Sequence, residues 1–142
     1  MQKKASAVWS GDLKTGKGSI STESGVLSNA QYGFNTRFEN GPGTNPEELI
    51  GAAHSGCFSM ALSAQLGNAG LKAEKIETSA TVTLDKVEPA GWTITGVHLQ
   101  VKAKIPGADQ AAFDKAANAA KAGCPISRLL NTKITMDAQL VS

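Results

Sequence analysis

Residues 44–67, TNPEELIGAAHSGCFSMALSAQLG, carry the strongest structural signal in the chain. Thr44 or Asn45 can cap a helix, Pro46 suits its first position, and the next two glutamates face the positive end of the helix dipole. Apolar or small residues then occupy almost every position up to Gly67, where we expect the helix to end. Because a helix without a broad polar face is usually buried, this segment predicts the central helix of the fold.

The segments on either side of this helix predict an α+β fold. Upstream, alternating apolar and polar residues separated by turns favour three extended stretches, the third of them YGFNTRFE at residues 32–39. Downstream we expect strands at 75–87 and 92–105, helices at 106–123 and 124–131, and a strand at 132–141. No linker or repeat interrupts the chain, so we expect one domain over residues 1–142, with an antiparallel sheet packed on the central helix and a second helix.

Composition excludes several classes of protein. With 41% hydrophobic and 18% charged residues, the 142-residue chain is not expected to be disordered. The net charge of +2 comes from scattered lysines without a basic block, so we do not expect nucleic acid as a partner. The most apolar stretch is too polar for a membrane span, and no apolar run follows the N-terminus as in a secretory signal. We therefore expect a cytoplasmic protein with reduced thiols.

The two cysteines are the first candidates for chemistry. Cys57 lies in the middle of the expected buried helix, where a free cysteine is most often a small apolar core residue. Cys124 lies at the N-cap of a helix opened by Pro125, where backbone N–H groups and the helix dipole favour a thiolate. Taken alone, it is equally compatible with a loop cysteine without a role. Since burial disfavours the charged form of Cys57, electrostatics alone predicts Cys124 as the better nucleophile.

Ionisation of Cys57 needs a positive partner, and Arg37 is the candidate. It is one of two arginines in the chain and stands between Phe34 and Phe38, so its guanidinium needs an anion; a structural ion pair is the alternative. Glu47 can orient that guanidinium, although it is also an ordinary acid of a first helical turn. Ten residues of helical rise, roughly 15 Å, separate Glu47 from Cys57. Either the helix breaks, or Glu47 serves the cysteine of a second protomer.

Metal and cofactor sites are not expected. His54 lies three residues before Cys57 on the same helical face, which is half a metal site at most. The other histidine, His98, falls in a strand-like stretch, and the chain has no CxxC pair. A packed or hydrogen-bonded His54 is the better interpretation. The chain also lacks a Gly-rich phosphate loop and a GxSxG elbow, so no bound cofactor is expected.

The same residues carry a resemblance to a known family. GTNPEELIGAAHSGCFSMAL, residues 43–62, and AKAGCPIS, residues 120–127, resemble the two cysteine motifs of the OsmC/Ohr family. SGDLKTGKGSISTESGVL and YGFNTRFENGPGTNPEELI, beginning at residues 10 and 32, resemble its OsmC branch. The resemblance runs from near residue 5 to residue 142 without a large insertion.

The resemblance implies a thiol peroxidase with an α+β fold that acts as an intertwined homodimer with active sites at the interface. It implies that Cys57 is the peroxidatic cysteine, Cys124 the resolving cysteine, and Arg37 with Glu47 the activating pair, which reverses the electrostatic ranking above. The implied substrates are organic hydroperoxides and, more weakly, hydrogen peroxide. The cycle would pass through a sulfenic acid and a disulfide between the two cysteines, and an external thiol or dithiol would reduce that disulfide.

Two other function classes remain open from the sequence. A non-catalytic redox sensor or stress-response binding protein would use the same thiols for a single oxidation. A small-ligand binding module would bury two inert cysteines, whose thiols would react only after denaturation. Repeated peroxide turnover distinguishes the enzyme from both.

Overall fold

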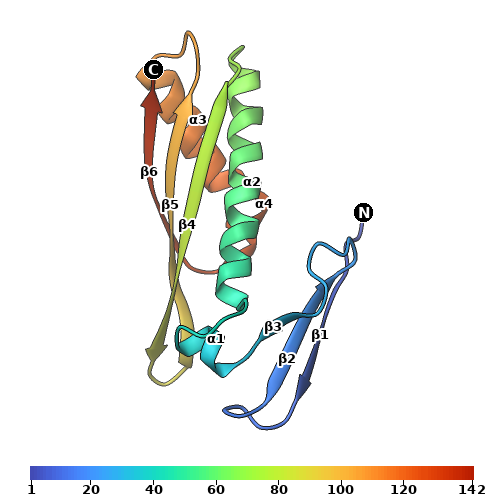
Figure 1. Cartoon of the computed structure of the whole chain (residues 1–142). Coiled ribbons are helices and arrows are strands. Elements are labelled where there is room, and N and C mark those ends of the chain that lie inside the picture. Colours follow the sequence, from blue (N-terminus) through green and yellow to red (C-terminus); the bar gives the residue numbers. More distant parts are fainter. The chain divides into compact units, whose positions relative to one another are not determined.

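The computed structural model describes residues 1–142 and contains two compact units, Met1–Leu49 and Ile50–Ser142 (Figure 1). Each unit has a three-stranded sheet accompanied by helix, so the predicted α+β class is confirmed. The single domain expected over residues 1–142 stays a prediction. None of the helices combines the length and the apolar character needed to cross a membrane.

The first unit contains a small antiparallel sheet in the order β1-β2-β3. Its elements are β1 (Ala5–Ser10), β2 (Lys17–Thr22), β3 (Ala30–Tyr32) and the short helix α1 (Phe34–Phe38). The rings of Trp9 and Tyr32 pack with centroids 5.5 Å apart across Gly18 of β2. A Cβ atom at Gly18 would collide with both rings, so this close approach requires glycine.

The expected third extended stretch over residues 32–39 is wrong from residue 34 onward, because Phe34–Phe38 form helix α1. The Thr36 hydroxyl accepts a hydrogen bond from the Gly33 N–H at 2.9 Å and donates one to the Gly33 carbonyl at 3.0 Å. These bonds close the first helical turn. Phe34 and Phe38, four residues apart, stack with ring centroids 4.8 Å apart. A spacing of four residues places the two rings on one face of a helix, whereas aromatic residues are also common in strands.

The predicted central helix is confirmed as α2 (Pro46–Asn68). Its N-terminus is capped by Asn45, whose side-chain oxygen accepts the Glu48 N–H at 2.8 Å. At its other end the Leu71 N–H bonds to the Leu66 carbonyl at 2.9 Å, with Gly70 in the left-handed conformation at φ +74°. The helix therefore runs as one element through the boundary between the two units.

Burial of α2 on all sides was expected and is wrong for the single chain. A single stripe is buried, formed by Glu47, Gly51, His54, Phe58, Leu62 and Leu66. The exposed positions include Ala52, Ala53, Met60 and Ala64. Met60 alone keeps 77% of its surface exposed. Helix α2 therefore has an exposed face that carries apolar residues.

The second unit adds a sheet in the order β4-β5-β6 (Figure 1). Its elements are β4 (Lys75–Val87), β5 (Gly91–Lys104), α3 (Gln110–Gly123), α4 (Pro125–Leu129) and β6 (Lys133–Val141). The expected antiparallel arrangement holds for β4 and β5, but β6 pairs parallel to β5. Helices α3 and α4 lie between β5 and β6 in the chain, and such a crossover allows neighbouring strands to run in the same direction.

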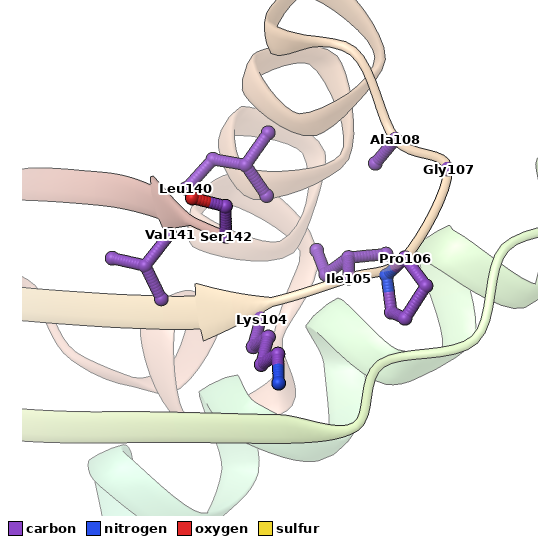
Figure 2. A pocket seen from close by; sticks show the side chains of 8 residues that line it. All are labelled: Lys104, Ile105, Pro106, Gly107, Ala108, Leu140, Val141 and Ser142. Atoms are coloured by element: carbon purple, nitrogen blue, oxygen red, sulfur yellow. The ribbon is translucent and has the colours of Figure 1, made fainter.

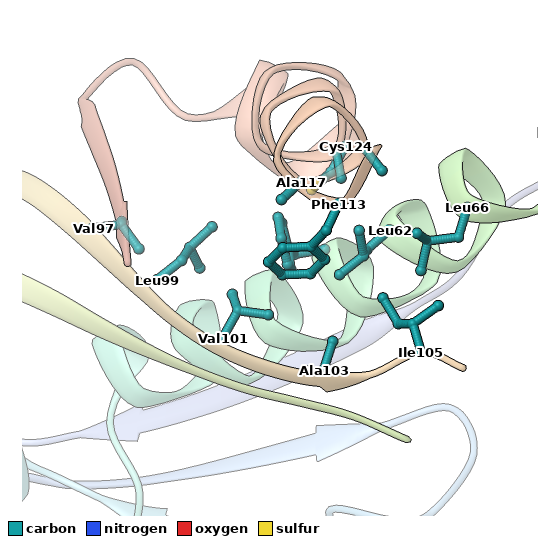
Figure 3. Packing of buried hydrophobic residues seen from close by; sticks show 13 residues of the cluster. Leu62, Leu66, Val97, Leu99, Val101, Ala103, Ile105, Phe113, Ala117 and Cys124 are labelled. Carbon is teal, nitrogen blue, oxygen red and sulfur yellow. The ribbon is translucent and has the colours of Figure 1, made fainter. Parts of the chain in front are cut away.

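The core of this unit joins β5 to the helices (Figure 3). Every second residue of β5 from Val97 to Ala103 is buried, as expected for one face of a strand. The largest buried helical side chains are Phe58 of α2 and Phe113 of α3. Cys124 belongs to the same cluster. The core therefore holds Cys124 against the helix that carries Cys57.

Candidate active site

The two cysteines lie side by side in the second unit. Cys57 is half-buried on α2, whereas Cys124 is completely buried, at 0% exposure. Cys124 ends α3, where its N–H bonds to the Ala120 carbonyl at 2.9 Å, and it also caps α4. The Cys57 and Cys124 thiols lie close enough to shift each other's pKa, although 67 sequence positions separate the residues. The structure thus brings both sequence-predicted cysteines together in the reduced state.

Cys124 lies in an environment that stabilises its thiolate. Burial raises the pKa of Cys124, but hydrogen bonds from Ser127, Cys57 and the backbone of Ile126 outweigh that effect and place the pKa below its ordinary value. The Ser127 N–H lies 3.4 Å and its hydroxyl oxygen 3.6 Å from the Cys124 sulfur. The sulfur therefore receives donors from the first turn of α4, as the N-cap position predicts.

Cys57 has the opposite tendency. Burial raises the pKa of Cys57 most, a hydrogen bond from the Ile126 backbone lowers it, and the neighbouring Cys124 raises it again. The chain by itself thus favours a Cys124 thiolate beside a Cys57 thiol. This order agrees with the ranking predicted from electrostatics alone.

Arg37 and Glu47 form the second pair of predicted site residues. The Arg37 Nε lies 3.0 and 3.2 Å from the two Glu47 carboxylate oxygens, and Nη2 lies 2.7 Å from Oε1. The Glu47 side chain is only 10% exposed, whereas that of Arg37 is 38% exposed. The Phe38 ring lies beneath the guanidinium, 5.4 Å from ring centroid to Cζ. Glu47 thus holds the Nε edge of the guanidinium and leaves Nη1 for a second anion.

The continuity of α2 excludes the first sequence-based alternative for Glu47, a break in the helix. The helix does not break between Pro46 and Asn68. Ten residues of helical rise therefore separate Glu47 from Cys57, roughly 15 Å along the axis. The predicted residues accordingly form two pairs within the chain, Cys57 with Cys124 and Arg37 with Glu47.

His54 and Ser127 extend the cysteine pair. His54 is completely buried, and its Nε2 lies 2.7 Å from the Ser127 hydroxyl oxygen, so the expectation of a packed, hydrogen-bonded histidine is confirmed. Burial lowers the pKa of His54, so its imidazole is neutral at neutral pH. Ser127 is not among the site residues predicted from the sequence. The sequence signal for Ser127 is its position three residues after Cys124, because an N-capping residue contacts the backbone and side chain of the residue three positions later.

Two other features of the second unit lie apart from the cysteines. His98 of β5 bonds to Thr135 and Asp137 of β6, at 2.7 and 3.2 Å. A surface pocket occupies the ends of β5 and β6 and is lined by residues 104–108 and 140–142 (Figure 2). Neither feature includes a residue of the candidate site.

Comparison with known proteins places this arrangement in context. The family model described as OsmC-like protein matches residues 39–139. Peroxiredoxin OsmC of Escherichia coli K12 is 56% identical over 142 residues, covering 100% of this chain and 99% of that protein. The organic hydroperoxide resistance protein OhrB of Bacillus subtilis 168 is 30% identical over 123 residues, covering 87% of this chain and 88% of that protein.

Solved structures show the same fold at low sequence identity. An OsmC-like protein of unknown function from Vibrio cholerae has a TM-score of 0.78 and 16% identity, with 98% of this chain and 99% of that chain covered. The crystal structure of Bacillus subtilis OhrB has a TM-score of 0.68 and 24% identity, with 97% and 98% covered. The likeness extends over the whole chain in both cases.

Proposed function

The chain belongs to the family of OsmC-like proteins and is a peroxidase, and we propose that it reduces organic hydroperoxides with a two-cysteine cycle. In this cycle Cys57 attacks the peroxide and Cys124 resolves the product. The observation that carries the proposal is the proximity of the two thiols, because Cys57 packs against the cluster that contains Cys124 and each shifts the other's pKa. Residues so far apart in sequence can form a disulfide only if the fold brings their sulfurs together.

In the first step the Cys57 thiolate attacks the terminal peroxide oxygen. A sulfur–oxygen bond forms, the oxygen–oxygen bond breaks, and the sulfur loses two electrons to become the sulfenic acid. The leaving alkoxide takes a proton and departs as the alcohol. Hydrogen peroxide reacts in the same way and leaves as water.

In the second step the Cys124 thiolate attacks the sulfur of the Cys57 sulfenic acid. The disulfide forms and hydroxide leaves, taking a proton to become water. An external dithiol then reduces the disulfide by two exchange reactions and is itself oxidised to a disulfide. The depressed pKa of Cys124 suits this step, because the thiolate is the attacking species. The cycle uses no bound cofactor.

Arg37 supplies the positive charge that Cys57 lacks within its surroundings. Its guanidinium is oriented by Glu47 through the contacts of 2.7 to 3.2 Å, which leaves donors for the thiolate or the peroxide. The stacked rings of Phe34 and Phe38 lie on the same short helix and offer apolar surface near the cation. That combination favours a peroxide with an organic group over hydrogen peroxide.

We further propose that the working form is an intertwined homodimer in which Arg37 and Glu47 of one protomer serve Cys57 of its partner. The unbroken α2 separates Glu47 from the Cys57 of its own helix by roughly 15 Å, which supports action on another chain. The exposed apolar face of α2, with Met60 at 77% exposure, gives a second copy a surface to cover.

Repeated turnover is the first test of this function. Protein at about one-hundredth of the peroxide concentration, supplied with excess dithiol, is expected to consume all of the cumene hydroperoxide or tert-butyl hydroperoxide present. Hydrogen peroxide should be consumed more slowly. Consumption that stops after one equivalent per protein chain would identify the redox sensor instead, and thiols inert until denaturation would identify a binding module.

Cys124→Ser is expected to halt the cycle after the first step. The sulfenic acid of Cys57 should accumulate, because serine cannot form the disulfide, and dimedone should trap it as an adduct that mass spectrometry detects. Rapid first oxidation with slow turnover would support the assignment of Cys124 as the resolving residue. Wild-type turnover in this variant, with no trapped adduct, would contradict it.

A further inference from the structure

A buried chain of hydrogen bonds joins α2 to the first turn of α4. His54 Nε2 lies 2.7 Å from the Ser127 hydroxyl oxygen, which lies 3.6 Å from the Cys124 sulfur. The Ser127 N–H also points to that sulfur at 3.4 Å. His54 and Cys124 are both fully buried, and all three residues belong to the unit Ile50–Ser142. The chain therefore ends on the sulfur that the proposed cycle uses in its second step.

The direction of the protons follows from an atom that has no partner. Ser127 has one hydroxyl proton, which it can donate either to His54 Nε2 or to the Cys124 sulfur. If Nε2 accepted it, the imidazole proton would be on Nδ1, which is buried and makes no hydrogen bond. A buried N–H without an acceptor is unfavourable, and a thiolate is a stronger acceptor than a neutral imidazole. The favoured arrangement is therefore His54 Nε2–H donating to Ser127, and Ser127 donating to Cys124.

We propose that His54 is a positioning residue for the resolving step, which acts through the Ser127 hydroxyl to hold the Cys124 sulfur as an anion directed at Cys57. The inference rests on the proposed function, because it requires Cys124 to attack the oxidised Cys57. It requires no further reactant. Ser127 can donate its only hydroxyl proton in a hydrogen bond to the Cys124 sulfur because the serine oxygen accepts a hydrogen bond from His54 Nε2–H.

The other groups around Cys124 do not replace this arrangement. The titratable groups that face its sulfur are Cys57 and, through Ser127, His54, both on α2. Oxidation of Cys57 removes the effect of its thiol on Cys124, whereas the Ser127 N–H and hydroxyl still lie beside the Cys124 sulfur. Ser127 and His54 are therefore the main groups that stabilise the Cys124 thiolate when it attacks the oxidised Cys57.

The first test is a titration of Cys124 in protein that carries Cys57→Ser. Because Cys124 is completely buried, the thiolate is followed by its ultraviolet absorbance and not by alkylation. His54→Leu and Ser127→Ala are each expected to raise the pKa of Cys124 by about one, the size expected for losing a hydrogen bond to a charged group. The double variant should show no larger shift than Ser127→Ala, since His54 acts only through that hydroxyl.

Two further variants sharpen the titration. His54→Gln, which keeps an N–H donor, is expected to restore part of the shift. Ser59→Ala is the matched control, because the Ser59 hydroxyl lies on the same helix but bonds to the Ser55 carbonyl and to Thr78, both at 2.8 Å, and to neither cysteine. An unchanged pKa in His54→Leu would overturn the inference. So would a His54→Leu effect of full size in the Ser127→Ala background.

A second measurement leaves residue 54 intact and remains decisive where His54→Leu fails to fold. Nitrogen-15 NMR of labelled histidine is expected to show a neutral His54 ring protonated on Nε2 at neutral pH. Protonation on Nδ1 would overturn the inference, because Ser127 would then donate to His54 and not to Cys124.

The rates of the two steps of the cycle distinguish a failure of this inference from a failure of the proposed function. With Cys57 and Cys124 both present, His54→Leu should leave the first oxidation by peroxide unchanged and slow disulfide formation at pH 7 about tenfold. The rate should recover as the pH is raised. Turnover by the wild type together with an unaffected His54→Leu refutes only the role of His54. Absence of turnover in the wild type refutes the peroxide cycle and leaves the titration and the NMR result valid.

Discussion

Replacing Cys57 by serine is expected to lower peroxide turnover at least about a thousand-fold, because a serine hydroxyl cannot reach the anionic form that attacks peroxide at neutral pH. The substitution changes one atom in the middle of α2 and leaves the buried stripe of the helix untouched. Loss of activity should therefore occur without loss of structure. Peroxide consumption in the presence of dithiol measures the first quantity, and circular dichroism with thermal unfolding measures the second.

Cys124→Ser is the matched control for Cys57→Ser, because it makes the same atomic change on the neighbouring sulfur. The two variants are expected to differ in kind. Cys57→Ser should give no dimedone adduct after peroxide, whereas Cys124→Ser should give one. If Cys57→Ser kept substantial turnover and Cys124→Ser lost it, Cys124 would be the peroxidatic residue, as its depressed pKa alone would indicate.

Mixing two inactive variants is expected to restore activity if Arg37 serves the partner protomer. One protomer carries Cys57→Ser and the other carries Arg37→Met with Glu47→Gln, which removes the ion pair without leaving a buried unpaired carboxylate. We expect each variant alone to have less than about 1% of wild-type turnover. The purified heterodimer should have about one half, because one of its two sites keeps both the thiol and the guanidinium.

The heterodimer is obtained by co-expression with two different affinity tags and purification on both. The control is a doubly tagged dimer in which both protomers carry Cys57→Ser, which should remain inactive. A heterodimer no more active than its parents would show that Arg37 acts within its own chain or not at all. Failure to recover any doubly tagged species, together with monomer on gel filtration, would refute the dimer.

Local signals in the sequence were sufficient for most of the fold. The cap at Asn45 and Pro46 and the glycine at residue 67 located α2, and the long alternating segments located β4 and β5. Residues 34–38 were misassigned because aromatic residues favour strands, while the helix depends on Thr36 bonding to Gly33. The direction of β6 was not predictable from local pattern, because alternation does not say which strand, or which orientation, a strand pairs with.

The residues of the site were more predictable from the sequence than the contacts between them. Cys57 and Cys124 could be singled out from residue type and position, and the motifs assigned Arg37 and Glu47 to them. Ser127 was missed, because a serine in a short helix is unremarkable until a buried histidine 73 positions away is found bonded to it. Tertiary contacts of that kind depend on how α2 packs, which the sequence does not state locally.

Cys124 also begins the helix α4, since its sulfur accepts the Ser127 N–H in place of a side-chain oxygen. A sulfur shared in a disulfide has given up the negative charge that made it a good acceptor. We therefore expect formation of the proposed disulfide to weaken this contact at the start of the five-residue helix, and reduction to restore it. The order of the first turn of α4 would then follow the redox state of Cys124.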